Sequence, residues 1–380
     1  MRKTLQIKVL LINLVLLITA CSQINKASDF ITNPTAKEKY QRDFDISDEL
    51  FNLWKSQVDL ALQDSVNIEL PYAETGNFKP RGFQIYSYEI ELQPGEILNF
   101  TAETDSVKNL VFIELYQKMG DSIPNFKKIE TADFQKKEFS FEPETAGTYK
   151  LIVQPEIEAN TAFTFRIEKK PAYVFPVLAG KNNSIQSYWG AVRDGGARSH
   201  EGIDIFAKRG TPVVAATDGR ITFTGEKGLG GKQVWLRDNK RKQSLYYAHL
   251  DSIHPVSGKV KTGDTLGYVG NTGNARTTPP HLHFGIYKSY RGAIDPLGFV
   301  FQTPELEINN ASENNYPEKL LITSTKANLR NRPDTRNSKV LKTLNSNDTL
   351  NFLGKAKDWY HVRTFENKAS YIHQSLVAPI

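Results

Sequence analysis

Two short histidine-containing segments, far apart in the sequence, are the feature that most constrains the fold, because their residue types are those expected of the two halves of one site. The first contains His200 and Asp204, and the second contains His281 and His283. Together with His249, which lies between them, they hold four of the chain's seven histidines within about 85 residues. A chain with so few histidines has little reason to gather them unless they meet in space. The fold must therefore bring these two distant segments into contact.

The second segment has the pattern of a strand. Alternate side chains of a strand point to the same face, so His281 and His283 share one face and the apolar residues between and after them share the other. In the first segment, the spacing of His200 and Asp204 also suits a helix. A glycine beside two isoleucines favours an extended segment instead. An extended segment places His200 and Asp204 on one face and directs Glu201 away from it.

The residues around His249 are also expected to be extended. Strict alternation places Tyr247 and His249 on one face, and Tyr246, Ala248 and Leu250 on the other. Two imidazoles and one carboxylate are a ligand set of catalytic zinc, which keeps its fourth position open for water. That count leaves His249 and one histidine of the second segment unassigned.

These motifs resemble those of the M23 (LytM/lysostaphin-like) metallopeptidases, and the resemblance covers residues 173–302. Turns rich in glycine and proline between the motifs agree with it. The segments that carry the resemblance are His200-x-x-x-Asp204, Tyr247-Ala-His-Leu250 and His281-Leu-His-Phe284. The family implies a small, mostly antiparallel β-sheet with an open groove over the metal.

The resemblance also implies roles for single residues. A zinc ion (Zn²⁺) would be held by His200, Asp204 and His283, and His281 and His249 would form the catalytic pair. Zinc activates water and polarises the scissile carbonyl, and a neutral imidazole takes the proton and returns it to the leaving amine. The motifs leave open which of His281 and His249 is the base. We favour His281, because it neighbours a ligand.

The N-terminus resembles the signal of a bacterial lipoprotein. A positive start is followed by an apolar run over residues 7–18, which is too short for a membrane span. Small residues then precede Cys21, the chain's only cysteine. Residues 1–20 are therefore predicted to be a signal peptide, with Cys21 lipidated and the protein anchored to a membrane of the cell envelope. The alternative is a plain secretory signal that ends near Ala20.

Residues 21–65 are predicted to be a polar tether followed by one helix. Apolar residues recur at helical spacing between residues 44 and 62, and Asp48 is a plausible N-cap. This helix could pack on a later domain or occlude the groove.

Residues 66–172 are predicted to form a β-sandwich, because several short alternating segments are separated by turns. The expected strands cover residues 83–92, 111–116, 137–141, 147–153 and 162–168. No cluster of histidines, cysteines or carboxylates indicates chemistry there, so we expect a spacer, a binding surface or a regulator.

After a polar linker over residues 303–318, residues 319–380 resemble a bacterial SH3 (SH3b) domain, a small barrel. The resemblance rests on Leu329-Arg-x-x-Pro333 and Trp359-Tyr-x-Val362. Such a barrel is a binding module, and the implied target is peptidoglycan. Its aromatic residues Trp359, Tyr360 and Tyr371 either line a peptide groove or fill the core. The remaining histidines are taken as structural: His254, His361 and His373.

The sequence thus predicts a mostly β, multidomain protein. A net charge of +6 could suit nucleic acid, but no basic helix or aromatic-basic motif is present, and export argues against that partner. The expected function is a zinc metalloendopeptidase that hydrolyses peptide cross-links of peptidoglycan. The alternatives are a non-catalytic M23-like activator of other wall hydrolases and a zinc peptidase acting outside the wall. The motifs carry no information on oligomeric state.

Overall fold

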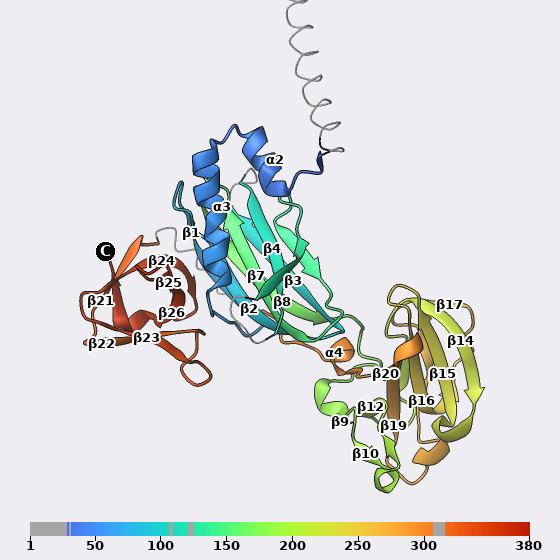
Figure 1. Cartoon of the computed structure of the whole chain (residues 1–380). Coiled ribbons are helices and arrows are strands. Elements are labelled where there is room, and N and C mark those ends of the chain that lie inside the picture. Colours follow the sequence, from blue (N-terminus) through green and yellow to red (C-terminus); the bar gives the residue numbers. More distant parts are fainter. Residues whose placement is uncertain (1–28, 30–31, 106–108, 121–124, 307–315) are drawn as a thin grey trace, which may run out of the picture.

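The computed structural model describes residue 29 and residues 32–105, 109–120, 125–306 and 316–380. The predicted mostly β, multidomain fold is confirmed. A β-sandwich lies between a C-terminal barrel on one side and a central domain (residues 173–302) on the other (Figure 1). Cys21 and the predicted signal peptide lie outside the described residues. None of the helices within the described ranges has the length and apolar character needed to cross a membrane.

Between residues 36 and 62 the chain forms two helices, not the expected single one: α2 (Ala36–Asp43) and α3 (Asp48–Leu62). The break follows from local chemistry. Asp45 adopts a positive φ of 50°, which a continuing helix does not allow. The side chain of Ser47 then accepts a hydrogen bond from the backbone of Leu50 and caps α3. The predicted cap, Asp48, is instead the first residue of the helix.

Both helices pack on the sandwich. Trp54 of α3 is only 1% exposed, and its indole N–H donates to the carbonyl oxygen of Pro155 at 2.9 Å. The ring of Phe112 meets that of Trp54 edge-on, with centroids 5.1 Å apart. Of the two roles expected for this region, packing on a later domain is therefore the one observed for α2 and α3 (Figure 1).

The sandwich consists of two antiparallel sheets with a shared apolar core. Its first sheet has the strand order β1 (Tyr72–Phe78), β8 (Thr161–Pro171), β3 (Glu96–Thr104) and β6 (Glu138–Phe141). Its second sheet has the order β2 (Tyr86–Leu92), β7 (Gly147–Pro155), β4 (Val111–Lys118) and β5 (Phe126–Thr131).

The barrel is fused to the sandwich rather than attached by a linker alone. Strand β24 (Thr349–Ala356) pairs with β1, with Thr75 opposite Lys355, so the first sheet continues into the barrel. The barrel strands are β21 (Lys319–Ile322), β22 (Lys326–Arg330), β23 (Val340–Asn345), β24 (Thr349–Ala356), β25 (Trp359–Arg363), β26 (Ala369–His373) and β27 (Val377–Pro379). Residues 307–315 of the predicted linker lie outside the described residues.

A buried polar network crosses this interface. Glu74 is fully buried and accepts hydrogen bonds from the hydroxyl of Tyr88 at 2.9 Å and from Nδ1 of His361 at 3.0 Å. The hydroxyl of Tyr72 lies 2.5 Å from Glu74 and 2.7 Å from the hydroxyl of Tyr371. Tyr371 therefore belongs to the interface core and not to a peptide groove, and His361 has the structural role expected of it.

The central domain is built on one long antiparallel sheet that supports the histidine motifs. The order along the sheet is β17 (Lys259–Val260), β14 (Gly219–Glu226), β15 (Lys232–Asp238), β16 (Gln243–Ile253), β19 (His281–Lys288), β12 (Ile203–Phe206) and β9 (Ile185–Ser187). Paired beside it are β13 (Pro212–Val214), β18 (Thr265–Val269) and β20 (Gly292–Ile294). Between β9 and β12 in the chain, a short hairpin consists of β10 (Val192–Arg193) and β11 (Arg198–Ser199).

The central domain also contacts the sandwich directly. The helix α4 (Leu297–Val300) lies against the turn before β3, where a Cβ on Gly95 would come within 2.5 Å of the Phe299 ring. Glycine is needed at this turn for that approach and for its φ of +93°. Nearby, Arg241 forms a two-bond ion pair with Glu142 of the sandwich.

Candidate metal centre

Strand β19 places His281 and His283 on the same face, as the alternating pattern predicts. The strand lies between β16 and β12 in the middle of the sheet. The side chains of Leu282, Phe284 and Ile286 point to the opposite face and are fully buried in the core. The apolar face thus fixes the direction in which both imidazoles project.

Strand β12 brings Asp204 opposite His283 in the antiparallel register. Ile203 and Ile205 point into the core, as expected. His200 lies before the strand, which begins only at Ile203, so the strand prediction is wrong for this residue. It is held by the hairpin instead, because its backbone N–H donates to the carbonyl oxygen of Ala191 at 2.8 Å.

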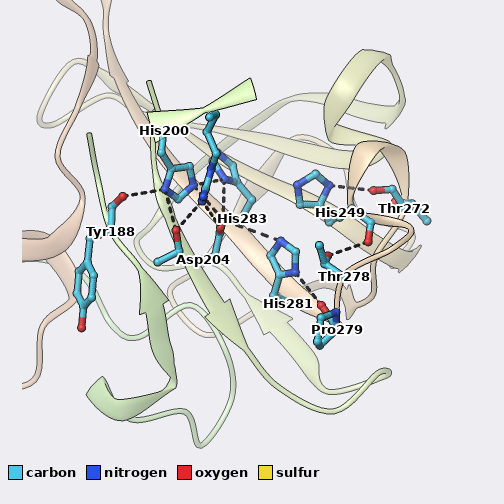
Figure 2. A network of polar contacts seen from close by, with 12 residues as sticks. Tyr188, His200, Asp204, His249, Thr272, Thr278, Pro279, His281 and His283 are labelled. Carbon is cyan, nitrogen blue, oxygen red and sulfur yellow. Dashed lines mark hydrogen bonds and ion pairs between the residues drawn. The ribbon is translucent and has the colours of Figure 1, made fainter. Parts of the chain in front are cut away.

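The donor atoms of His200, Asp204 and His283 converge (Figure 2). The Oδ1 atom of Asp204 is 3.0 Å from Nε2 of His200 and 3.0 Å from Nδ1 of His283, and the two nitrogens are 3.1 Å apart. Three ligands at tetrahedral zinc lie about 3.3 Å from one another, given metal–ligand bonds near 2.0 Å. The triangle is therefore close to the size that a tetrahedral metal ion requires.

The hydrogen bond on the far side of the His200 ring explains why a cation fits there. Its Nδ1 lies 2.8 Å from the carbonyl oxygen of Tyr188, which can only accept, so Nδ1 carries the proton of the neutral ring. Nε2 then directs a lone pair toward the carboxylate of Asp204. Two acceptors at 3.0 Å repel unless a cation or a further proton lies between them. This pattern, a ligating imidazole oriented by a carbonyl, is common at metal sites.

Asp204 is held as a carboxylate. Burial raises its pKa, but hydrogen bonds and charge interactions with His200 and His283 outweigh burial and lower the pKa well below the ordinary value. The site therefore offers one anionic oxygen and two imidazole nitrogens as donors.

His249 faces this site because of a bulge that the sequence pattern did not indicate. It adopts a φ of +63°, and the register of β16 shifts beside it. Strict alternation is therefore wrong here: Tyr247 points into the core and accepts a hydrogen bond from the backbone N–H of Ala216, while His249 turns to the opposite face. Bulges next to active sites re-aim a side chain in this way.

The two remaining histidines of the site present the same nitrogen to the cleft. Nδ1 of His249 lies 2.9 Å from the carbonyl oxygen of Thr272, and Nδ1 of His281 lies 2.9 Å from that of Pro279 (Figure 2). Each carbonyl keeps the proton on Nδ1, so each Nε2 is free to accept one. Nε2 of His281 is 4.0 Å from Oδ1 of Asp204. Two proton acceptors thus stand beside the donor triangle.

The environment keeps His249 neutral. Burial, followed by unfavourable charge interactions with the imidazoles of His283 and His281, lowers its pKa to about 4 from an ordinary value of 6.5. Between these two pH values the unfolded metal-free chain binds a proton at this residue and the folded chain does not. The free energy of unfolding of the metal-free protein should therefore fall as the pH drops from 6.5 toward 4.

Thermal unfolding of the metal-free protein between pH 4 and 7 would measure this slope. His249→Asn should flatten it, and asparagine also tolerates the positive φ. The matched control is His254→Asn, on the exposed surface, which should leave the slope in place. An equal slope in the wild type and in His249→Asn would show that His249 does not carry the dependence.

A cleft of about 770 Å³ lies over the donor triangle. The hairpin of β10 and β11 forms one wall, and the loops around Leu229 and Asn274 form the other. Burial raises the pKa of Tyr246 to about 12, so its hydroxyl remains a donor in the cleft. Glu201 also lines the cleft and accepts a hydrogen bond from Tyr287 at 3.3 Å, so the expectation that it points away from the site is wrong.

An arginine contacts the carboxylate of the donor set. Arg193 donates from Nη2 to Oδ2 of Asp204 at 2.8 Å. This contact was not predicted, because Arg193 lies in a turn-like stretch of the sequence without any periodic pattern or metal-ligand spacing. Only the folded hairpin brings it to the site.

Comparison with known proteins agrees with these motifs. Residues 198–296 match the model of Peptidase family M23, and residues 325–378 match that of the bacterial SH3 domain. The chain is 42% identical over 109 residues to the DD-carboxypeptidase/endopeptidase Mpg of Neisseria meningitidis, covering 29% of this chain and 24% of that protein. It is 37% identical over 125 residues to the L-Ala–D-Glu endopeptidase of Bacillus subtilis, covering 30% of this chain and 38% of that protein.

Among solved structures, the catalytic domain of lysostaphin from Staphylococcus simulans is 34% identical. The match covers 31% of this chain and 92% of that domain, with a TM-score of 0.28. The matched part spans 24% and 38% of the length of the two curated relatives. The chain thus spans less than half the length of either of these relatives.

Proposed function

We propose that this chain, whose residues 198–296 are an M23 peptidase domain by sequence match, is an exported zinc metalloendopeptidase that hydrolyses peptide cross-links of bacterial peptidoglycan. The observation that carries the proposal is the convergence of His200, Asp204 and His283, with two further imidazoles beside them. Nitrogen and carboxylate donors in this number are typical of zinc sites that keep one position open.

Zinc, when bound, would polarise the scissile carbonyl and activate a water molecule. The remaining chemistry falls to the chain's own side chains. We assign His281 as the general base, because its unprotonated Nε2 lies at the donor triangle, 4.0 Å from Asp204. It would take a proton from the attacking water and return it to the leaving amine.

His249 is the second member of the catalytic pair. Its pKa of about 4 makes it a weaker base than a histidine at its ordinary value. Its bare Nε2 would accept a hydrogen bond from water or from the substrate, and so orient the group that His281 deprotonates. Tyr246, whose hydroxyl stays protonated in the cleft, can donate to a substrate carbonyl.

The substrate class follows from the family resemblance and from the names of the relatives. Two of them are named for their bonds, an L-Ala–D-Glu endopeptidase and a glycyl-glycine endopeptidase. Since the named bonds differ, the M23 motifs do not specify the bond, and we propose only the class of peptide cross-links. The non-catalytic alternative is not favoured, because all five residues of the site are present. A zinc peptidase acting outside the wall is the remaining alternative.

The rest of the proposal concerns location and partners. We propose that Cys21 is lipidated and holds the protein at a membrane of the cell envelope, facing peptidoglycan. The barrel would bind the same polymer, and nucleic acid would not be a partner. A vesicle-partition assay that compares the wild type with Cys21→Ser, after expression in bacteria, would test the anchor.

Digestion of isolated peptidoglycan sacculi tests the activity. The Cys21→Ser chain should release muropeptides and reduce the content of cross-linked dimers, as read by mass spectrometry. A zinc chelator should abolish the release, and added zinc should restore it. The bond that disappears identifies the cross-link. Intact sacculi together with rapid cleavage of an unrelated protein would favour the substrate outside the wall, and no cleavage of either would favour the activator.

A further inference from the structure

Arg193 connects the metal-binding residues to the wall of the cleft. Asp204 directs Oδ1 toward His200 and His283, at 3.0 Å from each donor nitrogen. Its other oxygen, Oδ2, accepts a hydrogen bond from Nη2 of Arg193 at 2.8 Å. The two carboxylate oxygens therefore have separate partners: one faces the donor triangle, and the other faces a guanidinium.

The same nitrogen of Arg193 supports a second donor. Nη2 also donates to the hydroxyl of Ser187, which lies 3.3 Å from Nδ1 of His200. Ser187 pairs with Asp204 across β9 and β12. Nη2 of Arg193 thus contacts the carboxylate of Asp204 directly and reaches the His200 ring through the hydroxyl of Ser187.

The position of Arg193 suits a supporting role. Its side chain is 34% exposed and lies in the cleft wall, while the Asp204 side chain is 11% exposed. A charged hydrogen bond to a partly buried carboxylate is stronger and more directional than a neutral one. It resists rotation of the carboxylate, and rotation is the movement that would bring Oδ2 toward a metal.

We infer that Arg193 is a positioning residue that restricts Asp204 to one-oxygen coordination of the metal. A carboxylate can bind a metal through one oxygen or through both. Coordination through both would occupy a position that water or the substrate carbonyl needs. By engaging Oδ2, Arg193 keeps that position open. This inference rests on the proposed metal site and adds a determinant of its geometry.

Cobalt(II) substitution provides a readout that does not depend on turnover. Cobalt replaces zinc in such sites, and its visible absorption is intense when four-coordinate and weaker when the coordination number rises. The cobalt form of the Cys21→Ser chain should show the four-coordinate spectrum. In Arg193→Ala the intensity should fall, and zinc affinity, measured by competition with a chelator, should weaken by about 10–100-fold.

Two matched variants separate positioning from other effects. Arg193→Lys should restore most of the wild-type spectrum, because both hydrogen bonds start from one nitrogen, which an ammonium can replace. Arg198→Ala removes the other guanidinium of the hairpin that lines the cleft. It should leave the cobalt spectrum unchanged, even where it alters KM. Loss of kcat with unchanged KM is expected for Arg193→Ala.

The outcomes are distinguishable. An Arg193→Ala protein with the wild-type cobalt spectrum and zinc affinity overturns the inference while leaving the proposed function intact. Failure of the unsubstituted site to bind zinc or cobalt overturns the proposed function itself. If Arg193→Ala unfolds the hairpin, the spectrum of Arg193→Lys tests the inference instead. A lysine variant that folds but does not show the four-coordinate spectrum also contradicts the inference.

Discussion

Replacing His281 by alanine is expected to slow cross-link cleavage by about 10²–10⁴-fold while leaving the metal in place, because a positioned general base contributes that much to rate. In its proposed role the side chain accepts a proton, and it is not one of the three converging donors. Zinc content should therefore stay near one ion per chain, as measured by mass spectrometry of metals, while the initial rate of dimer loss from sacculi collapses.

The matched comparison is His200→Ala, which removes a donor. That variant should lose zinc and activity together, and excess zinc should not restore the rate fully. If His281→Ala also loses its zinc, then His281 is a ligand and our assignment of the donors is wrong. A larger loss of rate in His249→Ala than in His281→Ala would exchange the roles of the two histidines.

Replacing Asp64 by alanine is expected to destabilise the joined sandwich and barrel by about 3–5 kcal/mol, because it strands a buried charge. The Asp64 side chain has no exposed surface and accepts hydrogen bonds from Arg363 at 2.9 Å and from the backbone N–H of Ala369 at 3.0 Å. Both partners belong to the barrel, whereas Asp64 follows α3. The cost therefore falls on the interface.

Differential scanning calorimetry would follow the transition of this joined unit separately from that of the central domain. The control is Glu103→Ala, which breaks an exposed ion pair with Arg166 in the same sandwich and should cost less than about 1 kcal/mol. Arg363→Met, added to Asp64→Ala, should regain part of the loss, because it removes the stranded charge. An equal, small effect of both single substitutions would mean that the barrel is not held by this contact.

The sequence was most informative where one face of a strand is purely apolar. Leu282, Phe284 and Ile286 fix the direction of His281 and His283, so half of the site follows from a period of two. Where the period is broken, prediction failed. The positive φ of His249 inserts a bulge, and the side chain changes faces without any change in residue type.

Buried polar residues are the second reason why parts of the structure were not predicted. Strand β1 was not predicted, because Glu74 and Gly76 lie between its two aromatic residues on the inward face and interrupt the apolar pattern. Glu74 can be buried only because its partners come from elsewhere, including His361, some 290 residues away. No local pattern reports such a partner. The same holds for Arg193, which reaches Asp204 only through the folded hairpin.

The pairing of β1 with β24 makes residues 173–302 an insertion within a discontinuous structural unit. The two ends of the insertion meet, since the N–H of Tyr173 donates to the carbonyl oxygen of Phe299 at 2.9 Å. This insertion can be exchanged, or replaced by a short linker that joins its two ends, without interrupting the sheet that the sandwich and the barrel share. Removal of the barrel, in contrast, exposes the edge of β1 and the inward-facing Tyr72, and so produces a fragment that is prone to aggregate.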